Sequence, residues 1–253
     1  MAGARVELTS AHNSRAARAL LDRALQEVPP KSRAQVLLER ARADEYEGNL
    51  DRARETLRVA TDDAGHEWKV FLEAVLLERR AGRRDAAIAQ ATRALEVHSG
   101  TGRLWAVLVQ LRRADGDDAQ LKVFRHALMQ VPKSGEVWCE GARILLHPKS
   151  RHFDLTSARS FLDFAVQFTP QYGDSFIELV RVQLLRAALA FAVSRASRAD
   201  GAEAAASGQT ARLRNALEAA DLVDIERACV NADPNYGSMW FHCKARPFDT
   251  ASK

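Results

Sequence analysis

The amino-acid sequence predicts an all-α fold, a right-handed superhelix (solenoid) of stacked antiparallel helix pairs. Three observations predict it. The composition is rich in Ala, Leu, Arg and Glu, which favour helices, whereas only 13 Gly and 7 Pro occur among 253 residues. A short phrase ending in an aromatic residue recurs at intervals of repeat size. A second phrase, built on alanine, recurs ahead of the first in the same register, as expected for a repeat protein.

The aromatic phrase has a glycine three positions before the ring. Its intervals are 37, 33, 38 and 64 residues, so the last is nearly two repeats, or one repeat that carries an insertion. We expect each ring to open the first helix of a pair, helix A, and to pack in the seam between neighbouring pairs rather than to stack on nucleic-acid bases. The aromatic seam residues are Trp68, Trp105, Trp138, Phe176 and Trp240.

The alanine phrase predicts the second helix of each pair, helix B. An apolar residue usually lies three positions before the alanine, and another alanine often lies seven before it. These spacings place the residues on one helical face, where small side chains let a neighbouring helix approach closely. A proline commonly follows and ends the helix. The alanine seam residues are Ala24, Ala60, Ala94, Ala127, Ala165 and Ala228.

The two phrases together predict one solenoid domain over residues 1–253. A lone helix B near 14–28 comes first, and a lone helix A begins at about 236. The low-complexity stretch at 198–210 predicts a flexible insertion within the last full repeat. We interpret it as a surface insertion, with a partner-binding arm as the alternative. The predicted full pairs are 32–63, 65–98, 101–131, 135–168 and 173–232.

Two of these segments resemble a known repeat family. Residues 17–25 read Ala-Arg-x-Leu-Leu-x-Arg-Ala-Leu, and helix A of a later pair reads Trp68-x-x-Phe71-x-Glu73. Both resemble half-a-tetratricopeptide (HAT) repeats, the variant of the tetratricopeptide repeat found in RNA-processing assemblies. Plain tetratricopeptide repeats expect a small residue four positions after the ring, and only Ala142 fits. The resemblance therefore favours HAT-like repeats.

Longer stretches, at residues 127–148 and 232–240, are similar to the C-terminal superhelix of pre-mRNA splicing factors that bridge the tri-snRNP. This resemblance implies a non-catalytic protein–protein scaffold in a nuclear ribonucleoprotein assembly, with RNA contact secondary. Two alternatives stay open. One is a helical-repeat protein that binds single-stranded RNA directly, and the other is a general adaptor in trafficking or chaperone work. Either would be compatible with the cytoplasm or an organelle.

Composition and motifs indicate no enzyme. The net charge is +4, and the charges are interspersed rather than clustered as in most nucleic-acid binders. The sequence shows no phosphate-binding glycine loop, catalytic motif or metal-ligand spacing, so we expect no cofactor, metal or small-molecule substrate. Its apolar runs are too short to cross a membrane. The three cysteines, Cys139, Cys229 and Cys243, are expected to be buried free thiols.

Helix A positions that face the groove of a solenoid are the candidate partner contacts. Four cations among them, Lys69, Arg113, Arg143 and Arg181, would form a discontinuous basic stripe suited to an acidic peptide or a phosphate backbone. We favour the alternative, an ordinary solvated face or arginine–glutamate pairs between neighbouring helices. The full candidate set is Lys69, Glu73, Gln110, Arg113, Arg143 and Arg181.

Overall fold

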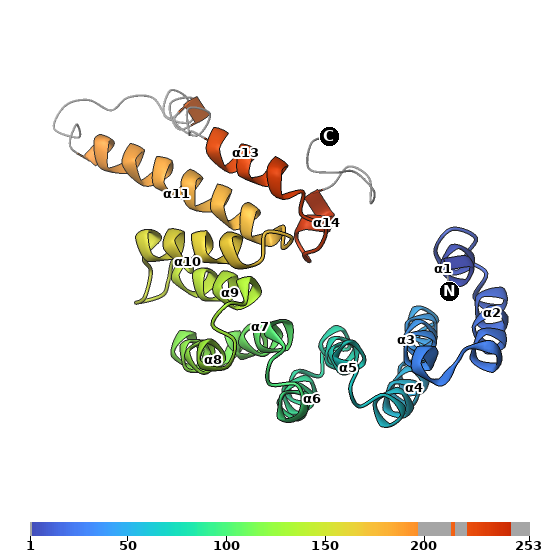
Figure 1. Ribbon diagram of the computed structural model, residues 1–253. Coiled ribbons are helices and arrows are strands. Elements are labelled where there is room, and N and C mark those ends of the chain that lie inside the picture. The colour runs from blue at the N-terminus through green and yellow to red at the C-terminus, as the bar shows by residue number, and fades with distance from the viewer. Residues whose placement is uncertain (1, 197–213, 216–221, 244–253) are drawn as a thin grey trace. The chain divides into compact units, whose positions relative to one another are not determined.

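The computed structural model describes residues 2–196, 214–215 and 222–243 (Figure 1). These residues form helices, turns and one isolated β-bridge, so the all-α prediction is confirmed. They belong to two compact units, Met1–Ala114 and Asp115–Lys253, and each unit is described by itself. The single domain over 1–253 therefore stays a prediction. The predicted insertion at 198–210 lies outside the described residues.

The first unit consists of helix pairs joined by short turns. One prediction here was wrong, because the helix at 14–28 is not alone: α1 packs against it. No Gly-x-x-aromatic phrase precedes α1, so the repeat pattern did not predict this helix. A 3₁₀ turn at Arg112–Asp115 follows the last helix. The helices are α1 (Ala2–Thr9), α2 (Ser14–Glu27), α3 (Pro30–Tyr46), α4 (Leu50–Asp63), α5 (Trp68–Arg80), α6 (Arg84–Val97) and α7 (Gly102–Leu111).

In the second unit, the predicted pairs 135–168 and 173–232 appear as α9–α10 and α11–α13. The predicted helix A from about 236 appears as the short α14, which begins at the aromatic residue of its phrase. The segment of the predicted pair 101–131 forms α7 and α8, but α7 belongs to the first unit and α8 to the second, so their pairing stays a prediction. The helices of this unit are α8 (Asp117–Gln130), α9 (Gly135–Leu145), α10 (Leu155–Phe168), α11 (Asp174–Ala196), α13 (Val223–Ala232) and α14 (Trp240–Cys243).

The B helices bury the face that the alanine phrase marks. Ala53, Leu57 and Ala60 of α4 are all at most 2% exposed, and Ala158 and Leu162 of α10 are fully buried. Because alanine has almost no side chain, the helix A of the next pair approaches closely at these points. In α9 the approach is closer still, since a Cβ on Gly141 would lie 2.4 Å from the ring of Phe124.

Helix A of one pair also contacts helix A of the next. In the first unit α3 contacts α5 and α5 contacts α7, and in the second unit α9 contacts α11. Within each unit the A helices therefore form a layer of their own. We call the surface of this layer that points away from the B helices the A-helix face, and all the candidate partner residues except Arg113 lie on A helices.

Candidate partner-binding surface

Tryptophan side chains stabilise the turns that precede helix A by hydrogen bonds to the backbone. The indole Nε1 of Trp105 donates to the carbonyl oxygen of Ser99 at 2.7 Å. Trp138 donates to Pro132 and Trp240 to Pro234, both at 2.8 Å. In every case the acceptor lies six residues before the tryptophan. The ring thus packs in the seam and closes the preceding turn with a hydrogen bond, a role that the sequence pattern did not predict.

The seam residues differ in burial. Trp105 and Phe176 are buried, whereas Trp68, Trp138 and Trp240 are half-buried. Four of the seam alanines, Ala60, Ala94, Ala127 and Ala165, are at most 1% exposed.

Two seam alanines require a correction. Ala24 is half-buried and Ala228 is exposed. Ala228 lies on α13, whose buried side faces α11 through Ile225. The following helix, α14, has only four described residues, so among the described residues little helix A surface is present to cover Ala228.

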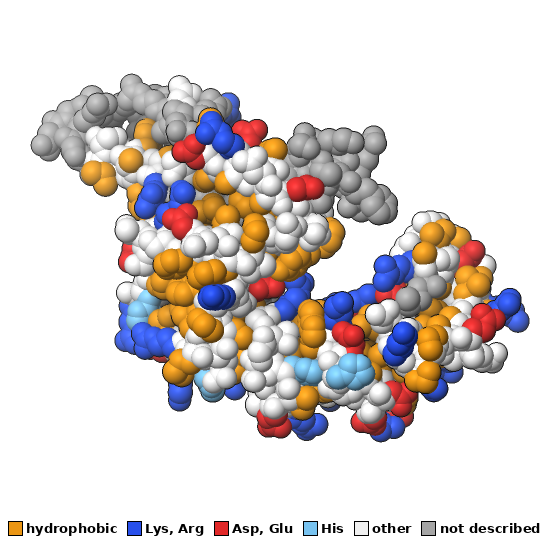
Figure 2. Space-filling view, in the orientation of Figure 1, with side chains coloured by type: hydrophobic (Ala, Val, Ile, Leu, Met, Phe, Trp, Pro, Cys, Tyr) orange, Lys and Arg blue, Asp and Glu red, His pale blue; other side chains and the backbone are white. Residues whose placement is uncertain are grey.

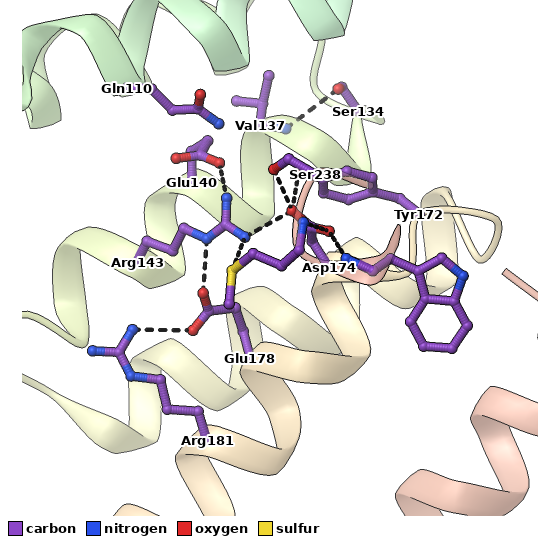
Figure 3. Close-up of polar contacts among 12 residues, drawn as sticks. Gln110, Ser134, Val137, Glu140, Arg143, Tyr172, Asp174, Glu178, Arg181 and Ser238 are labelled. Carbon is purple, nitrogen blue, oxygen red and sulfur yellow. Dashed lines mark hydrogen bonds and ion pairs between the residues drawn. The ribbon is translucent and has the colours of Figure 1, made fainter. Parts of the chain in front are cut away.

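Arg143 is the centre of a buried charge cluster in the second unit, where α9 meets α11 (Figure 3). Its Nη1 donates to Glu140 at 2.5 Å, its Nη2 to Asp174 at 3.0 Å and its Nε to Glu178 at 2.8 Å. The three carboxylates are at most 3% exposed. Arg181, one turn beyond Glu178, donates to the second oxygen of Glu178 at 3.2 Å. We call these five residues the Arg143 cluster.

The surrounding charges and hydrogen bonds keep Arg143 and Asp174 ionised despite their burial. Burial by itself would lower the pKa of Arg143, but the charges of Glu140 and Glu178 raise it above its ordinary value. Burial by itself would raise the pKa of Asp174, but the N–H of Trp240 and the Arg143 guanidinium lower it below its ordinary value. A buried charge is stable only when it is paired in this way.

Asp174 also holds the turn that precedes α14. Its Oδ1 accepts the backbone N–H groups of Met239 at 3.0 Å and Trp240 at 2.9 Å, and its Oδ2 accepts the hydroxyl of Ser238 at 3.1 Å. Gly237 has φ of +147°, and a Cβ there would lie 2.2 Å from Asp174 Oδ1. Glycine is therefore required at this point.

The first unit has a comparable arrangement. Arg42 of α3 donates to Glu39 at 2.9 Å and to Glu73 of α5 at 2.5 Å. Arg80 donates to Glu73 and to Glu45, both at 2.7 Å. Glu39 and Glu73 are buried. As in the Arg143 cluster, a buried acid on one helix A accepts a hydrogen bond from an arginine on the preceding helix A.

One spacing recurs in these contacts. Thirty-one residues separate Arg42 from Glu73, Arg79 from Gln110, and Arg143 from Asp174, and each arginine donates to the residue that follows it. We call these contacts the 31-residue pairs. Each of them joins one helix A to the next.

The structure places the six candidate contacts differently from the predicted basic stripe. Arg143 and Arg181 are joined through Glu178, and Glu73 is buried beneath Arg42 and Arg80. Glu73 is therefore unavailable to a partner, which corrects its assignment.

The other three candidates lie in or beside the first unit's A helices. Gln110 accepts from Arg79 at 2.8 Å. Lys69 and Arg113 are exposed, and the Nζ of Lys69 lies 5.9 Å from the centre of the Trp68 ring. In Figure 2, Lys and Arg side chains lie interspersed with Asp and Glu side chains within each unit. Of the four cations, Arg143 pairs with carboxylates of the neighbouring helix α11 and Arg181 pairs with Glu178 of its own helix, whereas Lys69 and Arg113 are exposed.

Sequence reasoning missed the buried acids Glu39, Glu140, Asp174 and Glu178. Each lies on a helix whose local pattern gives no reason to single it out. The 31-residue spacing between an arginine and a hydrogen-bond acceptor was an available signal for Asp174 only.

Metal sites, membrane-spanning helices and cysteine thiols are considered next for the described part of the chain. There, no group of three or more His, Cys, Asp or Glu residues is arranged to hold a metal ion. No helix of this part is long and apolar enough to cross a membrane. Burial raises the pKa of the Cys139 thiol well above its ordinary value. Cys243, in contrast, is exposed, so the expectation of a buried thiol was wrong there.

Comparisons with known proteins agree with this architecture. The family model described as PRP6, TPR-like domain, matches residues 1–253. A TPR-containing protein of Dictyostelium discoideum is 46% identical over 195 residues, which make up 77% of this chain and 12% of that protein. The chain thus spans about an eighth of the length of this curated relative.

Among solved structures, a chain from the crystal structure of the APC/C hetero-tetramer Cut9–Hcn1 is similar, with a TM-score of 0.52 and 11% identity. The match covers 96% of this chain and 48% of that chain. At this identity the likeness shows the fold alone, a helical repeat.

Proposed function

Because the chain belongs to the PRP6 TPR-like domain family, we propose that it is a non-catalytic scaffold for protein–protein contacts in a pre-mRNA splicing assembly. The family match over residues 1–253 and the similarity to tri-snRNP-bridging factors support this proposal. The scaffold acts by geometry: rigid helix pairs present the A-helix face to an extended or helical segment of a partner. The corresponding location is the nucleus.

Several arginines of the A-helix face are already paired with carboxylates, which favours a protein partner over RNA. This observation carries the proposal. Binding to a phosphate backbone requires cations that can replace its counterions. Arg42, Arg80 and Arg143 are each already bound to two or more carboxylates. Moving Arg143 to a phosphate would leave the buried acids Glu140 and Asp174 without a guanidinium partner, at a cost of about 3–5 kcal/mol.

The same arginines are well suited to protein groups. The side chains of Arg42, Arg80 and Arg181 remain 44%, 42% and 46% exposed. A guanidinium held in a fixed orientation can still offer N–H groups to a carbonyl or carboxylate oxygen of a partner. Lys69 and Arg113 supply exposed charge on the first unit's A helices or just beyond them. We therefore propose these five side chains as partner contacts.

Affinity purification of the full chain from nuclear extract, with and without ribonuclease, tests the proposal through identification of the bound proteins and RNAs. Proteins of splicing ribonucleoproteins should remain bound after ribonuclease treatment. Loss of every partner with the RNA would indicate a direct RNA binder instead. Recovery of trafficking or chaperone proteins alone would indicate a general adaptor.

A matched pair of variants tests which face is used. Lys69→Glu combined with Arg113→Glu changes exposed charge on the proposed contact residues. The control, Lys122→Glu combined with Arg125→Glu, makes the same charge change on exposed positions of the B helix α8. The first variant should weaken partner recovery, whereas the control should not. Equal recovery with the two variants would contradict the assignment of Lys69 and Arg113.

A further inference from the structure

A groove lies on the first unit between the B helices α4 and α6, with the A helix α5 as its floor. It has a volume of about 450 Å³. Its floor is apolar and includes Phe71, Ala74 and Leu77 of α5, with Leu57 of α4 beside them. Charged and polar side chains of α4 and α6 form the rim. Because B helices line this groove, it is separate from the A-helix face and plays no part in the proposed scaffold contacts.

The corresponding space in the second unit, between α8 and α10 over α9, is occupied by the chain's own aromatic rings. Phe161 and Phe164 of α10 both lie 5.0 Å from the Trp138 ring, centre to centre. Phe161 also lies 5.6 Å from Phe124 of α8. Phenyl rings therefore suit the space between two B helices of this repeat.

The register of the repeat identifies what stands in place of these rings on α6. Phe161 and Phe164 lie four and one positions before the seam alanine Ala165. The same positions before Ala94 are Gln90 and Arg93, and both line the groove. Both are exposed polar side chains, whereas Phe164, although 41% exposed, packs its ring against Trp138. The floor residue Phe71 is accordingly only half-buried.

The charges at the rim are compensated except at one point. Arg54 pairs with Asp51 and Glu78, and Arg58 pairs with Glu55 and Asp62. In the described part of the chain, Arg93 has no ion-pair partner. The groove thus combines an apolar floor that fits a ring with one available guanidinium at its edge, and a guanidinium binds carboxylates well.

From these observations we propose that the α4–α6 groove is a second docking site, which takes a peptide segment with an aromatic side chain next to an acidic residue. The ring enters the space that Phe161 and Phe164 fill in the second unit. The neighbouring carboxylate pairs with Arg93. The B helices therefore bind a partner independently of the A-helix face, whether or not the assembly is a splicing one.

NMR titration of the ¹⁵N-labelled chain with three blocked dipeptides tests this site. The probes are acetyl-Phe-Glu-amide, acetyl-Phe-Lys-amide and acetyl-Ala-Glu-amide. The Phe-Glu probe should give saturable shifts at the amides of Leu57, Phe71 and Arg93, with a Kd of about 1–10 mM. Affinity should fall about two- to fivefold for the Phe-Lys probe, as expected for loss of one exposed ion pair, and about tenfold or more for the Ala-Glu probe.

Substitutions at an exposed position separate binding from folding. Arg93→Phe should fill the groove as Phe164 fills its counterpart, and should abolish binding without lowering the Tm. Arg93→Glu should reverse the preference in favour of the Phe-Lys probe. Arg125→Phe, an exposed position of α8 outside the groove, should leave binding unchanged. Equal binding of the three probes, no saturable shift up to about 50 mM of the Phe-Glu probe, or unchanged binding by Arg93→Phe would overturn the proposal.

Discussion

The indole Nε1 of Trp138 donates to the carbonyl oxygen of Pro132 at 2.8 Å, and this bond closes the turn between α8 and α9. The ring itself packs against Phe124, Phe161 and Phe164. Trp138 therefore acts twice, through apolar packing and through a directional bond. The two contributions can be separated by substitution.

Trp138→Phe should keep most of the ring packing and lose the bond to Pro132. We expect the free energy of unfolding to fall by about 1 kcal/mol, whereas Trp138→Ala should lower it by about 3 kcal/mol or more. Urea unfolding followed by circular dichroism measures both. Trp68→Phe is the control, since the described residues give the Trp68 indole N–H no hydrogen-bond partner. Equal losses for Trp138→Phe and Trp68→Phe would show that the bond to Pro132 contributes nothing.

Arg143→Met should strongly destabilise the second unit. The substitution leaves Glu140, Asp174 and Glu178 buried with little compensation, and removing one partner of a buried pair costs about 3–5 kcal/mol. Arg159→Met removes an exposed pair with Asp163 on α10 and should cost less than about 1 kcal/mol. Urea unfolding measures both variants. A small effect of Arg143→Met would mean that solvent reaches the cluster and stabilises its acids.

Stability at acidic pH should depend on Asp174. The folded pKa of Asp174 lies below its ordinary value of 3.8, so the carboxylate stabilises the fold above about pH 4, and this contribution is lost as pH falls through the folded pKa. Asp174→Asn should lower the free energy of unfolding by about 3 kcal/mol at pH 7. The difference from the natural sequence should shrink towards pH 3.

Urea titrations at pH 7 and at pH 3 provide this measurement. Asp163→Asn, which affects the exposed pair with Arg159, should cost less than about 1 kcal/mol at either pH. A difference for Asp174→Asn that stays constant with pH would contradict the role of its charge.

Gly237→Ala should release the turn before α14 from the second unit. Its φ of +147° strains any L side chain, and the added Cβ would meet Asp174 Oδ1 at 2.2 Å. We expect faster amide hydrogen exchange at Met239 and Trp240, whose N–H groups Asp174 now accepts. Gly100→Ala is the matched control, because a Cβ there meets open space and the position has no positive φ. Unchanged exchange in Gly237→Ala would show that the turn adapts to the methyl group.

The sequence was sufficient to locate most of the helices, because each signal acts within one turn or one helix. The phrase ending in Trp138 predicts a helix A from 135, and α9 begins at Gly135. The alanine face of α4 and α10 follows from spacing alone. The repeat pattern did not predict α1, because this helix lacks the aromatic phrase. Ala228 is exposed because its burial depends on a neighbouring helix, which local spacing does not reveal.

The candidate surface was harder to predict for a related reason. Arg143 has the position expected of a groove residue, but its charge is cancelled by Asp174 and Glu178, which lie 31 and 35 residues away. Periodicity within one helix says nothing about such partners. The 31-residue pairs become recognisable only when Arg42 with Glu73 and Arg143 with Asp174 are compared.

The tryptophan bond has a consequence for how such chains can change over generations. Donor and acceptor, Trp138 and Pro132 for example, are encoded only six codons apart. A gene segment that encodes one helix pair therefore carries both the donor and the acceptor of its tryptophan hydrogen bond. Duplication or deletion of such a segment leaves the corresponding bonds of the neighbouring turns intact. The contact between Asp174 and Trp240 bridges 66 residues instead. Changes in repeat number are thus tolerated more readily before Asp174 than between Asp174 and Trp240.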